Sequence, residues 1–481
     1  MNPPLRPLRA LKLKPSSYPK PRYVSKTGTP RSSVVSTTST ASLNNFVQPS
    51  ATEKRTPESP LAVLPLSTVI RSLLILSISS SSILLKPCIH TLSALAQPRT
   101  SVLDVAKNPV LNWIIKNTIY KQFNAGENKL EVQRSIQEMK RLGYRGVLLG
   151  YAREVLAGES GSNLIDEKVA REEVNTWLQG TLQTVDMAHE GDFVALKFTG
   201  MGNEALNLLR QKLPPSEYMD KAIRSVCDSA IARGARLLVD AEEQAVQPGI
   251  EEWIMTYQKY INSKTPGHAT LYGTYQAYLR STPATIARHL ETARQEGYTL
   301  GVKLVRGAYL KTEPRHLIWA EKEETDRCYD GIVEALLTRR YNDVLKPASA
   351  EHTVELPPVN VIIATHNQDS VRKAHSIRLQ QAARGEPRVE LAYAQLQGMA
   401  DEVSCELLQG FHSAEAGTAG VATESPNVYK LLTWGSVKEC MGFLFRRAVE
   451  NTEAVGRTKQ SQLAMAEELK RRARKALGFH A

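Results

Sequence analysis

The sequence predicts a parallel (β/α)8 barrel preceded by an N-terminal helical subdomain. From residue 146 onward, short runs of apolar and β-branched residues alternate with segments of helical periodicity, which is the pattern of repeated βα units. Eight such runs are present, and eight parallel strands buried on both faces can close into a barrel. Polar residues collect near the ends of these runs, where the active sites of such barrels lie.

The predicted elements follow one another along the chain as βα units. The eight strands are expected at 146–150, 193–199, 236–240, 272–278, 301–309, 360–365, 389–395 and 429–434. Helical periodicity marks 167–190, 218–233, 284–296, 326–340, 370–384, 401–409 and 437–450. We expect 244–248 and 345–358 to be mobile loop insertions.

The composition divides the chain into four parts. Residues 1–55 hold ten Lys and Arg against one acid, Glu53, and are rich in Ser, Thr and Pro. This composition is typical of a mitochondrial transit peptide, with an ordinary disordered leader as the alternative. Residues 56–145 are expected to form the helical subdomain, 146–455 the catalytic barrel and 456–481 a C-terminal helical tail. Because 1–55 carry +9 of the formal +12, the remainder gives no indication of a nucleic-acid partner.

One apolar stretch, residues 61–85, is nearly long enough to span a bilayer. It contains Pro65, Arg71 and four serines at 79–82, all of which disfavour a membrane span. We therefore expect a buried pair of helices that packs on the main domain, and peripheral membrane attachment stays open. The amphipathic segment 129–141 belongs to the same subdomain.

The cysteines give no sign of a metal site. All five stand far apart in the sequence without the paired spacing of a disulfide framework or a zinc site. We expect buried thiols in a reducing compartment and no bound metal.

Polar residues at the ends of six predicted strands point to one site. Because carboxyl ends of barrel strands meet at one rim, these residues should converge, although each alone could be a satisfied buried group. They are Lys197, Asp240 with Glu242 and Glu243, Gln276, Lys303 with Arg306, Thr365 with His366 and Asn367, and Gln395.

The last predicted barrel helix carries two adjacent arginines, Arg446 and Arg447, with Glu450 one turn after Arg446. An exposed ion-pair face is the alternative interpretation. At a barrel mouth, however, two planar guanidinium groups can clamp one carboxylate. A small carboxylate substrate is indicated.

The turn after the first strand bears on the cofactor class. No G-x-G-x-x-G turn follows it, so dinucleotide binding in the doubly wound manner is not expected. A flavin can still lie across a barrel mouth, where cationic residues stabilise the reduced ring. The residues alone thus indicate a barrel enzyme with a small carboxylate substrate and an anionic cofactor.

Five ordered motifs resemble those of the proline dehydrogenase (proline oxidase) family. They are DAEE at 240–243, KLVRGAY at 303–309, ATHN at 364–367, QLQGM at 395–399 and FRRAVEN at 445–451. The resemblance runs from about residue 65 to 455, and the leader and insertions look like those of a fungal member. It implies FAD-dependent hydride removal from C5 of L-proline, which yields 1-pyrroline-5-carboxylate, and electron transfer to a membrane quinone. It also implies a mitochondrial location, on the matrix side of the inner membrane.

The resemblance assigns roles to single residues. Arg446 and Arg447, with Lys197, would clamp the substrate carboxylate, while Asp240 and Glu450 would orient these cations. FAD would contact Gln276, Lys303, Val305, Arg306, Gly307, Ala308, Thr365, His366, Asn367 and Gln395. Lys303 stands where many relatives have arginine. The substrate pocket would be walled by Leu304, Tyr309 and Leu396.

The eighth strand departs from the family pattern. Relatives commonly have Tyr-x-Pro-x-Gly where this chain has LLTWG at 431–435, so Leu431 replaces a substrate-contacting tyrosine. Such a change is worth about 1–3 kcal/mol of discrimination. Tyr429 would substitute for that tyrosine only if the alignment slips by two residues.

Three activities therefore remain open. They are oxidation of L-proline, oxidation of hydroxyproline or another cyclic imino acid, and a non-catalytic flavin-binding role. Retention of the paired arginines and Asp240 argues against the last, because buried charges without a substrate would destabilise the fold.

Overall fold

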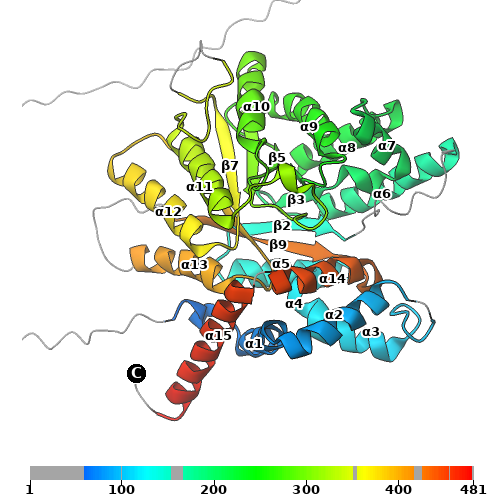
Figure 1. Ribbon diagram of the computed structural model, residues 1–481, viewed down its shortest axis with the longest axis vertical. Coiled ribbons are helices and arrows are strands. Elements are labelled where there is room, and N and C mark those ends of the chain that lie inside the picture. Colours follow the sequence, from blue (N-terminus) through cyan, green and yellow to red (C-terminus); the bar gives the residue numbers. More distant parts are fainter. Residues whose placement is uncertain are drawn as a thin grey trace, which may run out of the picture. The chain divides into compact units, whose positions relative to one another are not determined.

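The computed structural model describes residues 59–98, 100–152, 166–349, 355–415, 425–453 and 455–478. The predicted leader, 1–55, lies outside the described residues. In the described part, parallel strands close into a barrel surrounded by helices (Figure 1).

Each barrel strand pairs in parallel with the next along the chain. The strands are β2 (Gly146–Tyr151), β3 (Phe193–Leu196), β4 (Arg236–Val239), β5 (Leu271–Gln276), β6 (Leu300–Val305), β7 (Val359–Ala364), β8 (Leu391–Leu396) and β9 (Asn427–Trp434). Because β9 pairs with both β8 and β2, the barrel is closed, as predicted. A short strand, β1 (Asn124–Gly126), adds to β9. Its three residues carry no strand pattern, so this strand was not predicted.

Helices connect the strands on the outside of the barrel. They are α6 (Glu167–Met187), α7 (Asn203–Gln211), α8 (Glu217–Arg233), α9 (Gln247–Asn262), α10 (Thr282–Glu296), α11 (Lys322–Thr338), α12 (Gln368–Ala383), α13 (Asp401–Glu415) and α14 (Val437–Glu453). The prediction of a loop at 244–248 is wrong at its end, because α9 begins at Gln247. The proline there lies in the first helical turn, a position that tolerates proline. The other expected loop, 345–358, is only partly described.

Aromatic side chains fill the barrel interior. Phe193 of β3 makes edge contacts with Tyr272 of β5 and Tyr429 of β9, at ring-centroid distances of 5.4 and 5.2 Å. Leu148, Leu238 and Ile362 complete this layer from other strands. Since side chains alternate along a strand, positions two and four residues further along face the carboxyl-end mouth.

The N-terminal subdomain is helical. It contains α1 (Leu66–Ser80), α2 (Ser82–Ala96), α3 (Pro109–Ile115), the π-helical turn η2 (Lys116–Tyr120), α4 (Lys121–Phe123) and α5 (Lys129–Arg141). Val69 of α1 packs with Met465 of α15 (Val455–Ala476), and Leu92 of α2 packs with Leu444 of α14. The outer face of α1 and the first turn of α2 expose apolar side chains, so the prediction of a buried pair is wrong for those parts.

Within the described part of the chain, no single helix is long and apolar enough to cross a membrane. By length and composition, α1 and α2 qualify only together, as a pair bent by 100°.

Candidate active site

Lys303 lies inside the barrel, below the mouth. In the strand register it stands between Thr274 of β5 and Ile362 of β7, and Ile362 belongs to the barrel interior. Its Nζ donates to Oδ1 of Asp240, directly after β4, at 2.8 Å. The Lys303 side chain is only 6% exposed and that of Asp240 is 23% exposed. Since an ammonium group has three N–H donors, two remain for a further acceptor. Thr274 Oγ1, also buried, has no hydrogen-bond partner among the described residues.

Arg306, just after β6, joins two helices to the mouth. Its Nη2 donates to Ser370 Oγ of α12 at 2.8 Å and its Nε to Thr365 Oγ1 at 3.3 Å, while Nη1 pairs with Asp326 of α11. The guanidinium lies 4.9 Å from the ring centroid of Tyr329. Two of its five N–H donors remain. Asp326 and Ser370 carry no sequence signal, because their importance depends on where two outer helices begin.

The turn after Arg306 needs a glycine. Gly307 has φ +143°, and a Cβ there would lie 2.4 Å from the ring of Tyr278. The next amide, of Ala308, donates to Gln276 Oε1 at 3.2 Å, and Gln276 Nε2 donates to the Glu242 carbonyl at 3.1 Å. This part of the mouth is therefore lined closely by backbone.

Hydrogen bonds tie the ends of β7 and β8 together. The Leu396 amide donates to His366 Nε2 at 3.2 Å, and Gln395 Nε2 donates to the Thr365 carbonyl at 3.4 Å. Asn367 caps α12 by accepting from the Ser370 amide at 3.1 Å. All three residues of the predicted 365–367 set are thus engaged in shaping this rim.

The arginine pair lies on α14, together with Glu450. Glu450 forms an ion pair with Arg447, three residues earlier. The Arg447 guanidinium also lies 5.1 Å from the Phe443 ring centroid. Its side chain is 14% exposed, and its Nε is buried without a hydrogen-bond partner among the described residues. Arg447 therefore keeps a donor available for a carboxylate.

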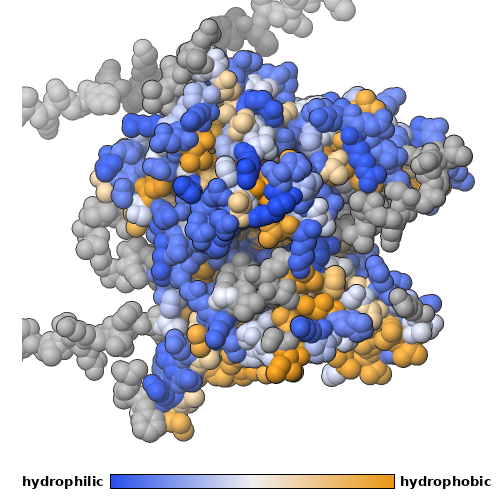
Figure 2. Space-filling view, in the orientation of Figure 1, coloured by the Kyte–Doolittle hydropathy of each residue, from blue (hydrophilic) through white to orange (hydrophobic). Residues whose placement is uncertain are grey.

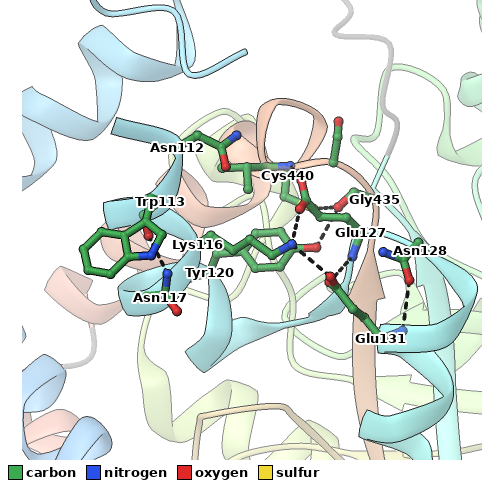
Figure 3. A network of polar contacts seen from close by, with 12 residues as sticks. Asn112, Trp113, Lys116, Asn117, Tyr120, Glu127, Asn128, Glu131, Gly435 and Cys440 are labelled. Atoms are coloured by element: carbon green, nitrogen blue, oxygen red, sulfur yellow. Dashed lines mark hydrogen bonds and ion pairs between the residues drawn. The ribbon is translucent and has the colours of Figure 1, made fainter. Parts of the chain in front are cut away.

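A polar network anchors the start of α14 (Figure 3). Glu127, after β1, accepts from the Val437 amide, the first of α14, at 3.0 Å. Lys116 of η2 pairs with Glu127 and donates to Glu131 at 2.9 Å. The Tyr120 hydroxyl donates to the Gly435 carbonyl at 2.7 Å. No motif marked these residues, because the network joins residues 116–131 to 435–437, which are distant in sequence.

The hydrophobic residues predicted to wall the pocket divide into two groups. Leu396, the last residue of β8, is the register partner of Leu431 within β9; Leu431 packs on the barrel interior and Leu396 on the α14 cluster. Leu304 instead faces outward and packs with Tyr329 and Ile332 of α11. The structure therefore does not bring Leu304 together with those two leucines, because it alternates with the inward-facing Lys303.

Two tyrosines were candidates for the pocket. Tyr309 lies in the loop beyond β6, where its carbonyl accepts from the amides of Thr312 and Glu313. Tyr429 packs on Phe193, and its hydroxyl donates to the Gly191 carbonyl at 3.4 Å, at the amino end of the barrel. It therefore does not replace the missing tyrosine at position 431.

The remaining predicted residues also flank the mouth. Lys197 directly follows β3, and its carbonyl accepts from the Trp177 indole at 3.0 Å. Val305 ends β6, two residues beyond Lys303. In the described ranges, no group of His, Cys, Asp or Glu is arranged to hold a metal ion.

Comparison with known proteins gives a consistent family. The family model described as proline dehydrogenase matches residues 132–460. Proline dehydrogenase 1, mitochondrial, of Caenorhabditis elegans is 32% identical over 277 residues, which cover 56% of this chain and 38% of that protein. The probable proline dehydrogenase, mitochondrial, of Schizosaccharomyces pombe is 26% identical over 462 residues, 85% of this chain and 88% of that protein. Hydroxyproline dehydrogenase of Bos taurus is 26% identical over 398 residues, 75% of this chain and 82% of that protein.

A solved structure shares the fold. The crystal structure of proline utilization A (PutA) from Bdellovibrio bacteriovorus, inactivated by N-propargylglycine, matches with a TM-score of 0.56. The sequence identity is 16%, and the match covers 80% of this chain but 38% of that longer one. At this identity the likeness concerns the barrel fold alone.

Proposed function

Since the chain belongs to the proline dehydrogenase family, we propose that it oxidises L-proline to 1-pyrroline-5-carboxylate with FAD and passes the electrons to a membrane quinone. The observation that carries the proposal is Lys303, a buried cation with unfilled donors inside the barrel mouth. A buried ammonium with one carboxylate partner favours an electron-rich ligand beside it.

The lining of the mouth fits a flavin nucleotide. Lys303 offers donors for the polar edge of a reducible ring, and Arg306 keeps two donors for the pyrophosphate. The N-terminus of α12, beside Arg306, adds a partial positive charge. Gly307, where the Tyr278 ring fills the direction of a Cβ, would contact the ligand through its backbone. Gln276, Ala308, Thr365, His366, Asn367, Gln395 and Val305 complete the proposed contacts.

The reaction needs little from the protein in the way of proton transfer. When bound, FAD supplies a two-electron acceptor for the hydride that leaves C5 of the substrate. If proline enters with a neutral amine, the nitrogen lone pair forms the C=N bond as the hydride leaves, so no general base is required. Asp240 holds Lys303 in place by its 2.8 Å hydrogen bond.

Recognition of the substrate is proposed for α14 and the ends of β8 and β9. Arg446 and Arg447, with Lys197, bind the carboxylate, and Arg447 Nε, which has no hydrogen-bond partner among the described residues, is a donor suited to this role. Glu450 fixes the Arg447 guanidinium. Leu396 and Leu431 present an apolar surface to the ring of the substrate.

Hydroxyproline is the second candidate substrate. The bovine relative named hydroxyproline dehydrogenase is as similar in sequence as the fission-yeast proline dehydrogenase, at 26% identity each. Leu431, however, offers no polar partner for a substrate hydroxyl, which favours proline.

A mitochondrial location is part of the proposal. The composition of 1–55 supports import, and relatives from worm and fission yeast are named mitochondrial. A fluorescent fusion to the full chain should co-localise with a mitochondrial dye, and a fusion that lacks 1–55 should stay in the cytosol. A full-length fusion that stays in the cytosol would contradict this location.

Steady-state turnover tests the choice of substrate. With a soluble quinone as acceptor and a chemical trap for the cyclic imine, we expect faster turnover per molar substrate with L-proline than with trans-4-hydroxy-L-proline. Leu431→Tyr should change the ratio of the two kcat/KM values by roughly 5- to 150-fold, the effect of about 1–3 kcal/mol. A ratio unmoved by Leu431→Tyr would remove Leu431 from the substrate pocket. Faster turnover of hydroxyproline by the native chain would favour the second candidate.

A further inference from the structure

The N-terminal subdomain exposes an unusual amount of apolar surface. Of the 18 large hydrophobic side chains that are exposed in the described residues, 11 lie between residues 66 and 114. They are Leu66, Ile70, Leu74, Ile78, Ile83, Leu84, Val102, Leu103, Val110, Trp113 and Ile114, here called the apolar patch. Figure 2 shows the hydrophobic colour gathered along the lower edge of the molecule, where Figure 1 places α1, α2 and α3.

The spacing of these residues makes one side of α1 and one side of α3 continuously apolar. Leu66, Ile70, Leu74 and Ile78 recur every four residues, so they share one side of α1. On α3, Val110, Trp113 and Ile114 follow the same rule. The opposite sides of α1 and α2 pack against α15 and α14, so the helices are held to the domain while the outer side of α1 and the first turn of α2 stay apolar.

The charge of the segment is one-sided. Residues 59–123 contain six Lys and Arg but a single acid, Asp104, which is buried. Lys86, Lys107 and Lys121 are exposed within it. An exposed tryptophan among apolar residues with lysines nearby is the composition of helices that lie in the interface of a bilayer.

We propose that the apolar patch docks the enzyme on the surface of an anionic lipid bilayer, with α1, α2 and α3 in the headgroup region. Lysines and apolar side chains both favour such a surface. A second copy of the chain fits the patch poorly, because a two-fold contact would set the same lysines against each other. The leader, at +9, is repelled by the same charges.

Docking would bring α14, the proposed substrate-binding helix, close to the lipid. The inner side of α2 packs on α14, so a single helix layer separates the patch from the helix that carries Arg446 and Arg447. Membrane docking would serve the proposed electron transfer to a membrane quinone, so its purpose rests on the proposed function. Lipid binding itself needs neither substrate nor acceptor, so the two proposals can fail separately.

Tryptophan fluorescence gives a test at the level of one residue. Of the five tryptophans, Trp113 is 66% exposed, the other four are buried or half-buried, and 1–58 contain none. The full chain is mixed with phosphatidylcholine vesicles that contain about one-third phosphatidylglycerol and brominated acyl chains. We expect quenching in the native chain, loss of most of it in Trp113→Phe, and weaker quenching without the anionic lipid. Absence of quenching in the native chain would overturn the proposal.

Two substitutions with matched exposure provide the control. Leu84 on α2 is 52% exposed and Val169 on α6 is 53% exposed. Leu84→Glu should lower partitioning to unbrominated vesicles by about tenfold, since it places a charge at the apolar interface, whereas Val169→Glu should leave it unchanged. Flavin content and reduction by proline should be native in both variants. Equal binding by Leu84→Glu and the native chain, or a shift from dimer to monomer without loss of vesicle binding, would refute docking by this patch.

Discussion

At the scale of single residues, the site depends on buried cations whose hydrogen-bond donors are only partly satisfied by the protein. Among the residues that the structure describes, Lys303 is buried and has one carboxylate partner, while Arg447 is paired with Glu450 and keeps a buried Nε without a hydrogen-bond partner. Unsatisfied donors in a buried site are costly unless a ligand completes them. We infer that substrate and cofactor binding complete these groups.

Arg446→Met tests the carboxylate clamp. It should raise the proline KM by about 30-fold or more, the effect of losing about 2 kcal/mol or more from a charge-assisted pair, while flavin stays bound. Arg171→Met, in an exposed pair with Glu167 on α6, is the control and should change nothing. An unchanged proline KM in Arg446→Met would remove that residue from the clamp.

His289 predicts a specific pH dependence of stability. Burial, with the nearby charge of Arg288, lowers the pKa of His289 from 6.5 to about 3. Its Nδ1 bonds the Tyr275 hydroxyl at 2.8 Å. Because the folded pKa is lowered, the unfolded chain binds the proton first, so the stabilising effect is complete above the unfolded pKa and falls as the pH drops from 6.5 toward 3.

His289→Gln removes this titration and keeps a hydrogen-bonding side chain. Between pH 7.5 and pH 5, the native chain should lose about 2 kcal/mol more of its free energy of unfolding than the variant. Denaturant titrations at both pH values measure the difference. Parallel losses in the two proteins would mean that His289 is not held neutral.

At the scale of elements, α14 matters because it carries both arginines and is fixed at its first residue. Glu127 caps it from β1, and Tyr120 holds the preceding Gly435 (Figure 3). A carboxylate at a helix N-terminus is favoured by the backbone amides and the helix dipole. The helical subdomain therefore positions the substrate-binding helix as well as covering the barrel.

Glu127→Gln tests this positioning. Loss of the charged cap and of the ion pair with Lys116 should destabilise the protein by about 1–2 kcal/mol and raise the proline KM. We expect kcat and flavin content to change little, and the KM-to-kcat split distinguishes positioning from general damage. Glu167→Gln, an exposed first-turn acid of α6, serves as the matched control. A native KM in a destabilised Glu127→Gln protein would leave the network with a structural role alone.

Sequence periodicity predicted the secondary-structure elements more accurately than it predicted side-chain contacts. All eight barrel strands were expected, because buried parallel strands are apolar throughout. The start of α9 was missed since Gln-Pro-Gly at 247–249 is typical of a turn as well as of a first helical turn. The outward direction of the Leu304 side chain depends on the face of β6 that it occupies, which a motif does not encode.

At the scale of the whole molecule, the barrel, the helical subdomain and α14 together surround the barrel mouth. The polar rim was predictable because carboxyl ends of parallel strands must meet. The exposed apolar face was not, since a buried helix pair and an interfacial one have similar composition. Partners such as Asp326, Ser370 and Glu127 come from the way distant segments meet in the fold.

Anaerobic titration of the purified protein with L-proline tests the central claim most directly. The visible absorption band of bound oxidised flavin is followed as proline is added, and then trans-4-hydroxy-L-proline is added to a fresh sample. We predict that the protein carries flavin and that proline bleaches the band, with hydroxyproline less effective. A protein without flavin, or a flavin band that proline leaves unchanged, would contradict the account.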